Sequence, residues 1–157
     1  MTFRRATGVV LAALVVAGAG CGGSGERRPA RATVDRADLQ VVRAWADALR
    51  SGDARGAARY FAVPSVVANG GPPTKLATVQ AVRFFNETLP CGAKVIGSQP
   101  ASHGFFIVTF RLTSRPGGAD CGRGATNTAR TAFRVRAGHI TDWLRVENLR
   151  PAPSAEI

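Results

Sequence analysis

Hydrophobic residues at the start of the predicted domain follow a helical period. Between residues 34 and 53 they recur at intervals of three and four, which places them on one face of a helix. That face carries Leu39, Val42, Trp45, Ala46 and Leu49. Gly52 is suited to end this helix, and Asp53 can cap a second, alanine-rich helix that extends to Phe61. The pattern therefore predicts two consecutive helices.

A third helix is predicted over residues 75–89, after Pro64 and the Gly/Pro-rich loop at residues 69–74 have interrupted the pattern. Apolar residues again lie three or four positions apart in this segment. The residues expected to be buried are Leu76, Val79, Val82, Phe85 and Leu89. The first half of the domain is therefore expected to consist of three helices, with a loop before the third.

The apolar period changes to two from residue 93 onward, which is typical of strands. Strands are predicted at residues 93–99, 105–115, 129–136 and 139–149. The second strand has Phe106, Val108, Phe110 and Leu112 on one face, and the third has Thr131, Phe133 and Val135. Helices followed by an antiparallel meander indicate an α+β domain whose helices pack on one face of the sheet.

Residues 1–20 have the composition of an export signal. A basic start precedes an apolar run that is shorter than the roughly 17–25 residues of a membrane-spanning helix. Cys21 follows small residues and precedes a Gly/Ser tract, which resembles the lipobox of bacterial lipoproteins and implies acylation of the cysteine. Gly18 departs from the lipobox, which usually has Leu, Val or Ile there, and cleavage after the A-x-A sequence at residues 17–19 is the alternative. We therefore expect a lipid anchor on the outer face of the cell membrane, with secretion as the alternative.

Residues 21–34 are predicted to form a flexible tether, because Gly, Ser, Pro and Arg follow one another there without an apolar period. Such a segment has a mean reach of roughly 20 Å, which would hold a domain at residues 35–149 just clear of a membrane. The tether arginines either lie near anionic lipid headgroups or are simply solvated. Residues 150–157 are expected to be a short C-terminal tail.

If Cys21 carries lipid, the exported domain keeps an even number of thiols, Cys91 and Cys121. Disulfides persist outside the cytosol, so a bridge between these two cysteines is the simplest interpretation, and two unpaired buried thiols are the alternative. Neither cysteine has a second Cys or a His at short ligand spacing. The sequence therefore predicts no metal site, and it contains no phosphate-binding or dinucleotide-binding motif that would indicate a cofactor.

The chain has a net charge of +11, and almost all of its positive charge comes from arginine, because Lys75 and Lys94 are its only lysines. An excess of Arg, Ala, Gly and Val is what a GC-rich genome produces, so the charge is weak evidence for nucleic-acid binding. Export argues further against a nucleic-acid partner. A cell-envelope protein that binds an anionic polymer or lipid through its arginine-rich strands is a separate hypothesis.

Two segments carry a resemblance to a known fold family. WADALRSGDARGAARYFA and AGHITDWLRV, which begin at residues 45 and 137, are similar to the opening helices and the closing hairpin of the nuclear transport factor 2-like superfamily, particularly its SnoaL-like members. The resemblance covers residues 35–146. It implies a cone in which a curved antiparallel sheet wraps around N-terminal helices and leaves an apolar pocket open at one end. Some members are isomerases, dehydratases or cyclases that use a pocket Asp, His or Tyr, and many others only bind a ligand or a partner.

The resemblance places four residues in the expected pocket: Trp45, Tyr60, Phe85 and Asn86. A tyrosine there can donate a hydrogen bond to a bound oxygen, although such residues more often fill a core. His103 and His139 both lie at predicted turns and are expected to be exposed.

Asp142 is the other candidate for chemistry. On a regular strand it would share a face with Ile140 and Leu144, where an apolar environment could turn its carboxylate into a general base. A bulge would instead turn it outward to pair with a nearby arginine, which is the interpretation we favour. The candidates for that pairing are Arg130, Arg134, Arg136 and Arg145.

These observations favour an exported, lipid-anchored binding or interaction module without catalytic activity. Its apolar pocket is expected to bind a small apolar ligand, or its partner is an envelope protein. A homodimer through the sheet face is a further expectation. The alternative is a small SnoaL-like isomerase or dehydratase that uses Asp142 as base and Tyr60 as hydrogen-bond donor.

Overall fold

The computed structural model describes residues 33–121 and 127–146. The helices are α1 (Arg36–Arg50), α2 (Ala54–Ala58) and α3 (Val79–Thr88), and the strands are β1 (Phe61–Ala68), β2 (Thr74–Leu76), β3 (Gly92–Pro100), β4 (Phe106–Thr113), β5 (Thr128–Arg136) and β6 (His139–Val146). The predicted export signal, Cys21, the tether up to residue 32 and the C-terminal tail lie outside the described residues.

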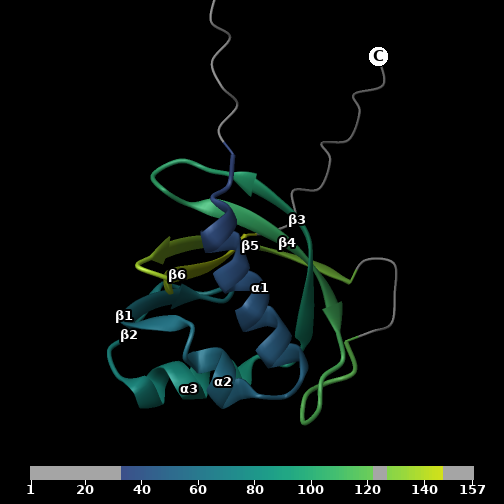
Figure 1. Cartoon of the computed structure of the whole chain (residues 1–157). Coiled ribbons are helices and arrows are strands. Elements are labelled where there is room, and N and C mark those ends of the chain that lie inside the picture. Colours follow the sequence, from purple (N-terminus) through teal and green to yellow (C-terminus); the bar gives the residue numbers. More distant parts are fainter. Residues whose placement is uncertain (1–32, 122–126, 147–157) are drawn as a thin grey trace, which may run out of the picture. The chain divides into compact units, whose positions relative to one another are not determined.

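The strands form one curved, six-stranded sheet in the order β2-β1-β6-β5-β4-β3, and α1 lies along one face of it (Figure 1). Strands β3 to β6 pair antiparallel in sequence order, as the alternating pattern predicts. The predicted α+β class is therefore confirmed. The expectation of a purely antiparallel sheet is wrong in one place, because β1 pairs parallel with β6.

Strand β1 is the main element that the sequence pattern did not reveal. The second helix was expected to reach Phe61, but α2 ends at Ala58 and Phe61 already begins the strand. Pro64 lies within a register shift between Phe61 and Val66, so its missing N–H falls where the ladder with β6 is interrupted. A proline and an irregular register break the period of two, which is why the alternation of apolar residues predicted no strand here.

The third helix is shorter than predicted. It begins at Val79 because the hydroxyl of Thr78 caps it, accepting a hydrogen bond from the backbone N–H of Ala81 at 3.1 Å. Residues 74–76 belong instead to β2, which pairs with β1. Val79 was expected to be buried, but as the first residue of the helix it remains 48% exposed.

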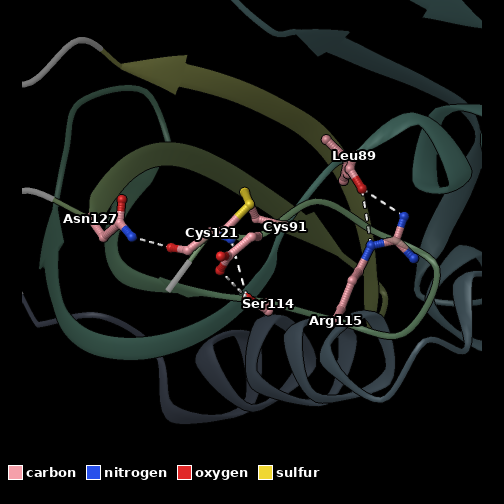
Figure 2. Close-up of a disulfide and its surroundings, with 7 residues drawn as sticks. Leu89, Cys91, Ser114, Arg115, Cys121 and Asn127 are labelled. Carbon is pink, nitrogen blue, oxygen red and sulfur yellow. Dashed lines mark hydrogen bonds between the residues drawn. A yellow bond between two sulfur atoms is a disulfide. The ribbon is translucent and has the colours of Figure 1, made fainter. Parts of the chain in front are cut away.

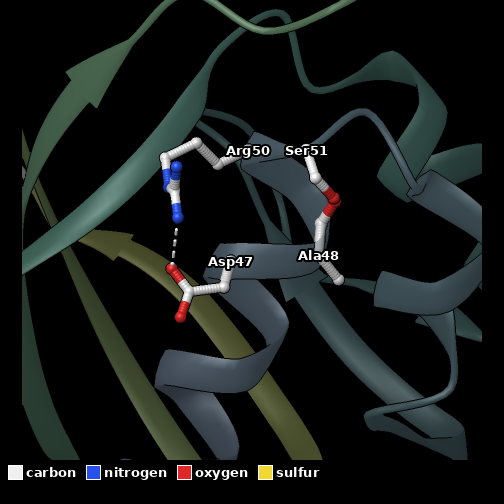
Figure 3. A network of polar contacts seen from close by, with 4 residues as sticks. All are labelled: Asp47, Ala48, Arg50 and Ser51. Carbon is white, nitrogen blue, oxygen red and sulfur yellow. Dashed lines mark hydrogen bonds and ion pairs between the residues drawn. The ribbon is translucent and has the colours of Figure 1, made fainter.

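Helix α1 is stabilised at both ends by its own side chains. The Asp35 carboxylate caps the N-terminus by accepting from the N–H of Ala37 at 2.7 Å. Figure 3 shows the last turn, where Arg50 Nη2 lies 3.0 Å from Asp47 Oδ1. Both of these side chains are exposed, so the ion pair adds little to stability.

The carboxyl group of Asp38, in the first turn of α1, has a shifted pKa. Partial burial raises this pKa, the neighbouring Asp35 adds to the rise, and Arg136 opposes it.

The core is centred on Trp45 of α1. Its indole makes edge-to-face contacts with Phe61, Phe110, Phe133 and Trp143, at ring-centroid distances of 5.7–6.5 Å. Phe110 and Phe133 belong to the strand faces that the alternation predicts, and both are buried as expected. The sheet thus curves around an aromatic cluster anchored by the first helix.

Candidate ligand pocket

An apolar cavity of about 70 Å³ lies between the end of α1 and the sheet. Its walls are mainly hydrophobic and include Trp45, Leu49, Leu89, Phe110, Leu112 and Trp143. Asn69, Thr131 and Arg145 add polar groups to the lining, and Arg145 is exposed. A cavity of this size has room for about five water molecules, or for the end of a small apolar ligand.

The Cys91–Cys121 disulfide closes one wall of this cavity. Figure 2 shows the bond, which has an S–S distance of 2.05 Å. Cys91 itself lines the cavity. Arg115 supports the same wall, because its Nε and Nη2 donate to the carbonyl oxygen of Leu89 at 3.0 and 2.6 Å. The connection between α3 and β3 is therefore held in place by both a covalent and a polar link, and Leu89 and Pro90 of that connection face the cavity.

Of the four residues expected in the pocket, Trp45 lies in the wall of this cavity and the other three lie elsewhere. Asn86 is fully buried, accepts from Trp45 Nε1 at 2.8 Å and donates to the carbonyl of Val82 at 2.9 Å, so its amide serves the core. Phe85 packs on Trp143 at a centroid distance of 5.2 Å. Tyr60 is half-buried beside the core cluster.

Asp142 lies on the outer face of the sheet, away from the cavity. A register shift between β5 and β6 makes Asp142 pair with Arg134 while Ile140 pairs with Val135. Strand β6 therefore has one extra residue, Thr141, opposite the consecutive residues Arg134 and Val135. The carboxylate lies 3.6 Å from Arg134 Nη1 and accepts from the hydroxyl of Thr141 at 2.8 Å. The inward-facing alternative for Asp142 as a pocket base therefore does not hold, and the bulge turns it toward an arginine.

The same bulge explains why the sequence pattern missed two residues of the cavity. Trp143 and Arg145 take the inward positions that a regular strand would have given to Asp142 and Leu144. A count of alternating positions from Ile140 cannot detect the inserted residue, because the bulge depends on pairing with β5. The available signal was the preference of a large indole for burial over a carboxylate.

We expect Asp142→Asn to lower the free energy of unfolding by about 1–2 kcal/mol, because it removes the charge from a largely shielded ion pair, with side chains 28% and 16% exposed, and keeps the shape of the side chain. Urea unfolding of both forms measures this difference. Asp47→Asn is the matched control, since it removes the exposed partner of Arg50. A loss of several kcal/mol, or weaker binding of an apolar ligand in the cavity of Asp142→Asn, would show that the carboxylate has another role.

The two histidines lie outside the cavity wall. His139 is exposed at the start of β6, with Nδ1 3.0 Å from the carbonyl oxygen of Ala137, and His103 is exposed in a turn with a positive φ of 58°. Within residues 33–121 and 127–146, no cluster of three or more His, Cys, Asp or Glu side chains is arranged to hold a metal ion. The helices in this part of the chain are too short or too polar to cross a membrane.

Comparison with known proteins reveals the fold and little sequence similarity. No protein-family model matches the chain, and no curated protein sequence is significantly similar to it. Among solved structures, a provisionally assigned polyketide cyclase from Sinorhizobium meliloti is 18% identical, with a TM-score of 0.52 over 68% of this chain and 94% of that one.

Two further structures have the same architecture. A protein from Catenulispora acidiphila with a ketosteroid isomerase-like fold, solved in complex with trimethylamine, is 13% identical over 70% of this chain and 86% of that one, with a TM-score of 0.52. A nuclear transport factor 2-like protein of unknown function from Cytophaga hutchinsonii is 10% identical over 73% and 91%, with a TM-score of 0.53. The described domain therefore has the nuclear transport factor 2-like fold, which it shares with these structures.

Proposed function

We propose that the protein is an exported, lipid-anchored binding module whose cavity holds a small apolar ligand. The observation that carries this proposal is the composition of the cavity wall, in which two indoles, a phenyl ring and several leucines surround about 70 Å³ of space. Hydrophobic walls with a few polar groups are typical of small-molecule sites. The ligand gains free energy mainly by leaving water, so shape and apolar area determine its affinity.

The SnoaL-like enzyme alternative has the fold in its favour, since structural neighbours include proteins named as a polyketide cyclase and as ketosteroid isomerase-like. Its proposed residues are separated in space, however. Asp142 pairs with Arg134 on the outer face, and Tyr60 lies outside the cavity wall. An isomerase or dehydratase working in this cavity would need a different base, so ligand binding is the function that the geometry supports best.

The two tryptophans of the chain both line the cavity, which provides a direct test. We expect titration with 1-hexanol to shift both indole N–H resonances in a ¹H–¹⁵N spectrum, and the shifts to saturate. Ala129→Leu, which fills part of the cavity, should weaken this binding at least fivefold. Ala132→Leu is the matched control, because Ala132 neighbours Leu144 on the outer face of β5. Unchanged indole resonances, or equal effects of the two variants, would refute the proposal.

Lipid anchoring is a separate part of the proposal and rests on the sequence around Cys21. We expect Cys21→Ser to release the protein into the medium or to leave it unprocessed, because the substitution removes the thiol that would be acylated. Fractionation of cells followed by mass measurement of the mature N-terminus provides the readout. A variant that remained membrane-bound and normally processed would contradict the anchor.

A further inference from the structure

The charge at the entrance of the cavity restricts the chemistry of its ligand. Arg145 follows Trp143 by two positions on β6, and both residues line the cavity. Trp143 is 6% exposed, whereas Arg145 is exposed, so the cationic group lies at the water-accessible side of an apolar chamber. Among the described residues, Arg145 has no ion-pair partner, and none of the residues in the cavity wall carries a negative charge. Within the described part of the chain, the cavity therefore combines an uncharged interior with a positive charge at its rim that has no ion-pair partner.

Trp143 supplies a second unused polar group. Its indole Nε1 is buried and has no hydrogen-bond partner within the part of the chain that the structure describes. The corresponding atom of Trp45 donates to Asn86 at 2.8 Å, so the two indoles of the cavity wall differ in this respect. The Trp143 nitrogen has almost no accessible surface, so it does not face the open space of the cavity. The guanidinium of Arg145 is therefore the cationic donor that the cavity wall offers to an oxygen acceptor.

We propose that the cavity binds an amphipathic carboxylate, with a short apolar chain inside and the anionic group at Arg145. This inference rests on the proposed function, since it specifies the ligand of the same cavity. A guanidinium binds a carboxylate through paired hydrogen bonds, and a carboxylate at the exposed rim keeps most of its hydration. A cavity of about 70 Å³ takes only the last few carbon atoms of such an apolar chain, since an apolar cavity of about 150 Å³ is needed for a whole benzene ring. A cation of equal size would be repelled by Arg145 and would find no acidic partner among the described residues of the wall.

Hexanoate and 1-hexanol form a matched pair of probes, because they share a six-carbon chain and differ in the charged group. We expect hexanoate to bind about tenfold more tightly than hexanol, with both probes shifting the indole resonances of the cavity wall. The preference should fall as ionic strength rises, because the pair lies at the water-accessible rim. In a series of carboxylates, affinity should rise about fourfold per methylene and level off once the cavity is full.

Arg145→Gln should lower the affinity for hexanoate about tenfold, to the level of hexanol, and Arg145→Lys should restore part of it. Arg111→Gln is the control, because Arg111 is an exposed arginine of β4 that does not line the cavity. Equal binding of the two probes, or an Arg145→Gln variant that keeps the preference, would overturn the carboxylate inference and leave the apolar binding site intact. If neither probe moves the indole resonances, the binding module itself is refuted.

Discussion

Replacing both Cys91 and Cys121 with alanine is expected to lower the free energy of unfolding by about 3–4 kcal/mol. The bond closes a loop with a sequence separation of 30, and a crosslink of that span removes much conformational freedom from the unfolded chain. Small domains have total stabilities of about 5–15 kcal/mol. The disulfide therefore supplies a large share of the stability of this domain, in addition to closing the cavity wall.

Urea unfolding of the exported domain measures this effect. Wild-type protein in the presence of a reductant should unfold at nearly the same midpoint as the Cys91→Ala/Cys121→Ala variant, and the reductant should not affect the variant. A free-thiol assay on unreduced wild-type protein should detect neither cysteine. A variant that lost less than about 1 kcal/mol would show that the bridge adds little to stability under these conditions.

Asn86→Leu is expected to cost about 2 kcal/mol, even though leucine has nearly the same size and is more hydrophobic. Asn86 is completely buried, and its side-chain oxygen accepts the indole N–H of Trp45 at 2.8 Å. Leucine leaves that donor without a partner in the centre of the aromatic cluster. The cost therefore comes from an unpaired polar group and not from lost packing.

A double-mutant cycle separates this cause from a general disturbance of the core. Trp45→Phe removes the indole donor, so Asn86→Leu should cost at least 1 kcal/mol less in that background than in wild type. Urea or thermal unfolding of the four forms gives the coupling energy. Asn69→Leu is the control, because Asn69 is an exposed amide at the cavity. Additive costs for Trp45→Phe and Asn86→Leu would mean that the hydrogen bond does not couple the two residues.

The periodic spacing of apolar residues in the sequence was sufficient to predict most of the helices and strands and their buried faces. The helical stripe on Val42 and Trp45 predicts α1, and the alternation around Phe110 and Phe133 predicts the inner faces of β4 and β5. Each pattern repeats many times within one element, so a single element contains the information about which side is buried. The class of the fold follows from the order of these elements.

Only the tertiary structure decided how β1 and β6 pair within the sheet. This pairing in turn determines which residues of β6 line the cavity. The pairing of β1 with β6 and the bulge opposite Arg134 depend on strands that are distant in sequence, and no local period records them. Insertion of one residue exchanges the two faces of a strand, because side chains alternate with a period of two. That single insertion places Asp142 outside, beside Arg134, and brings Trp143 and Arg145 to the cavity.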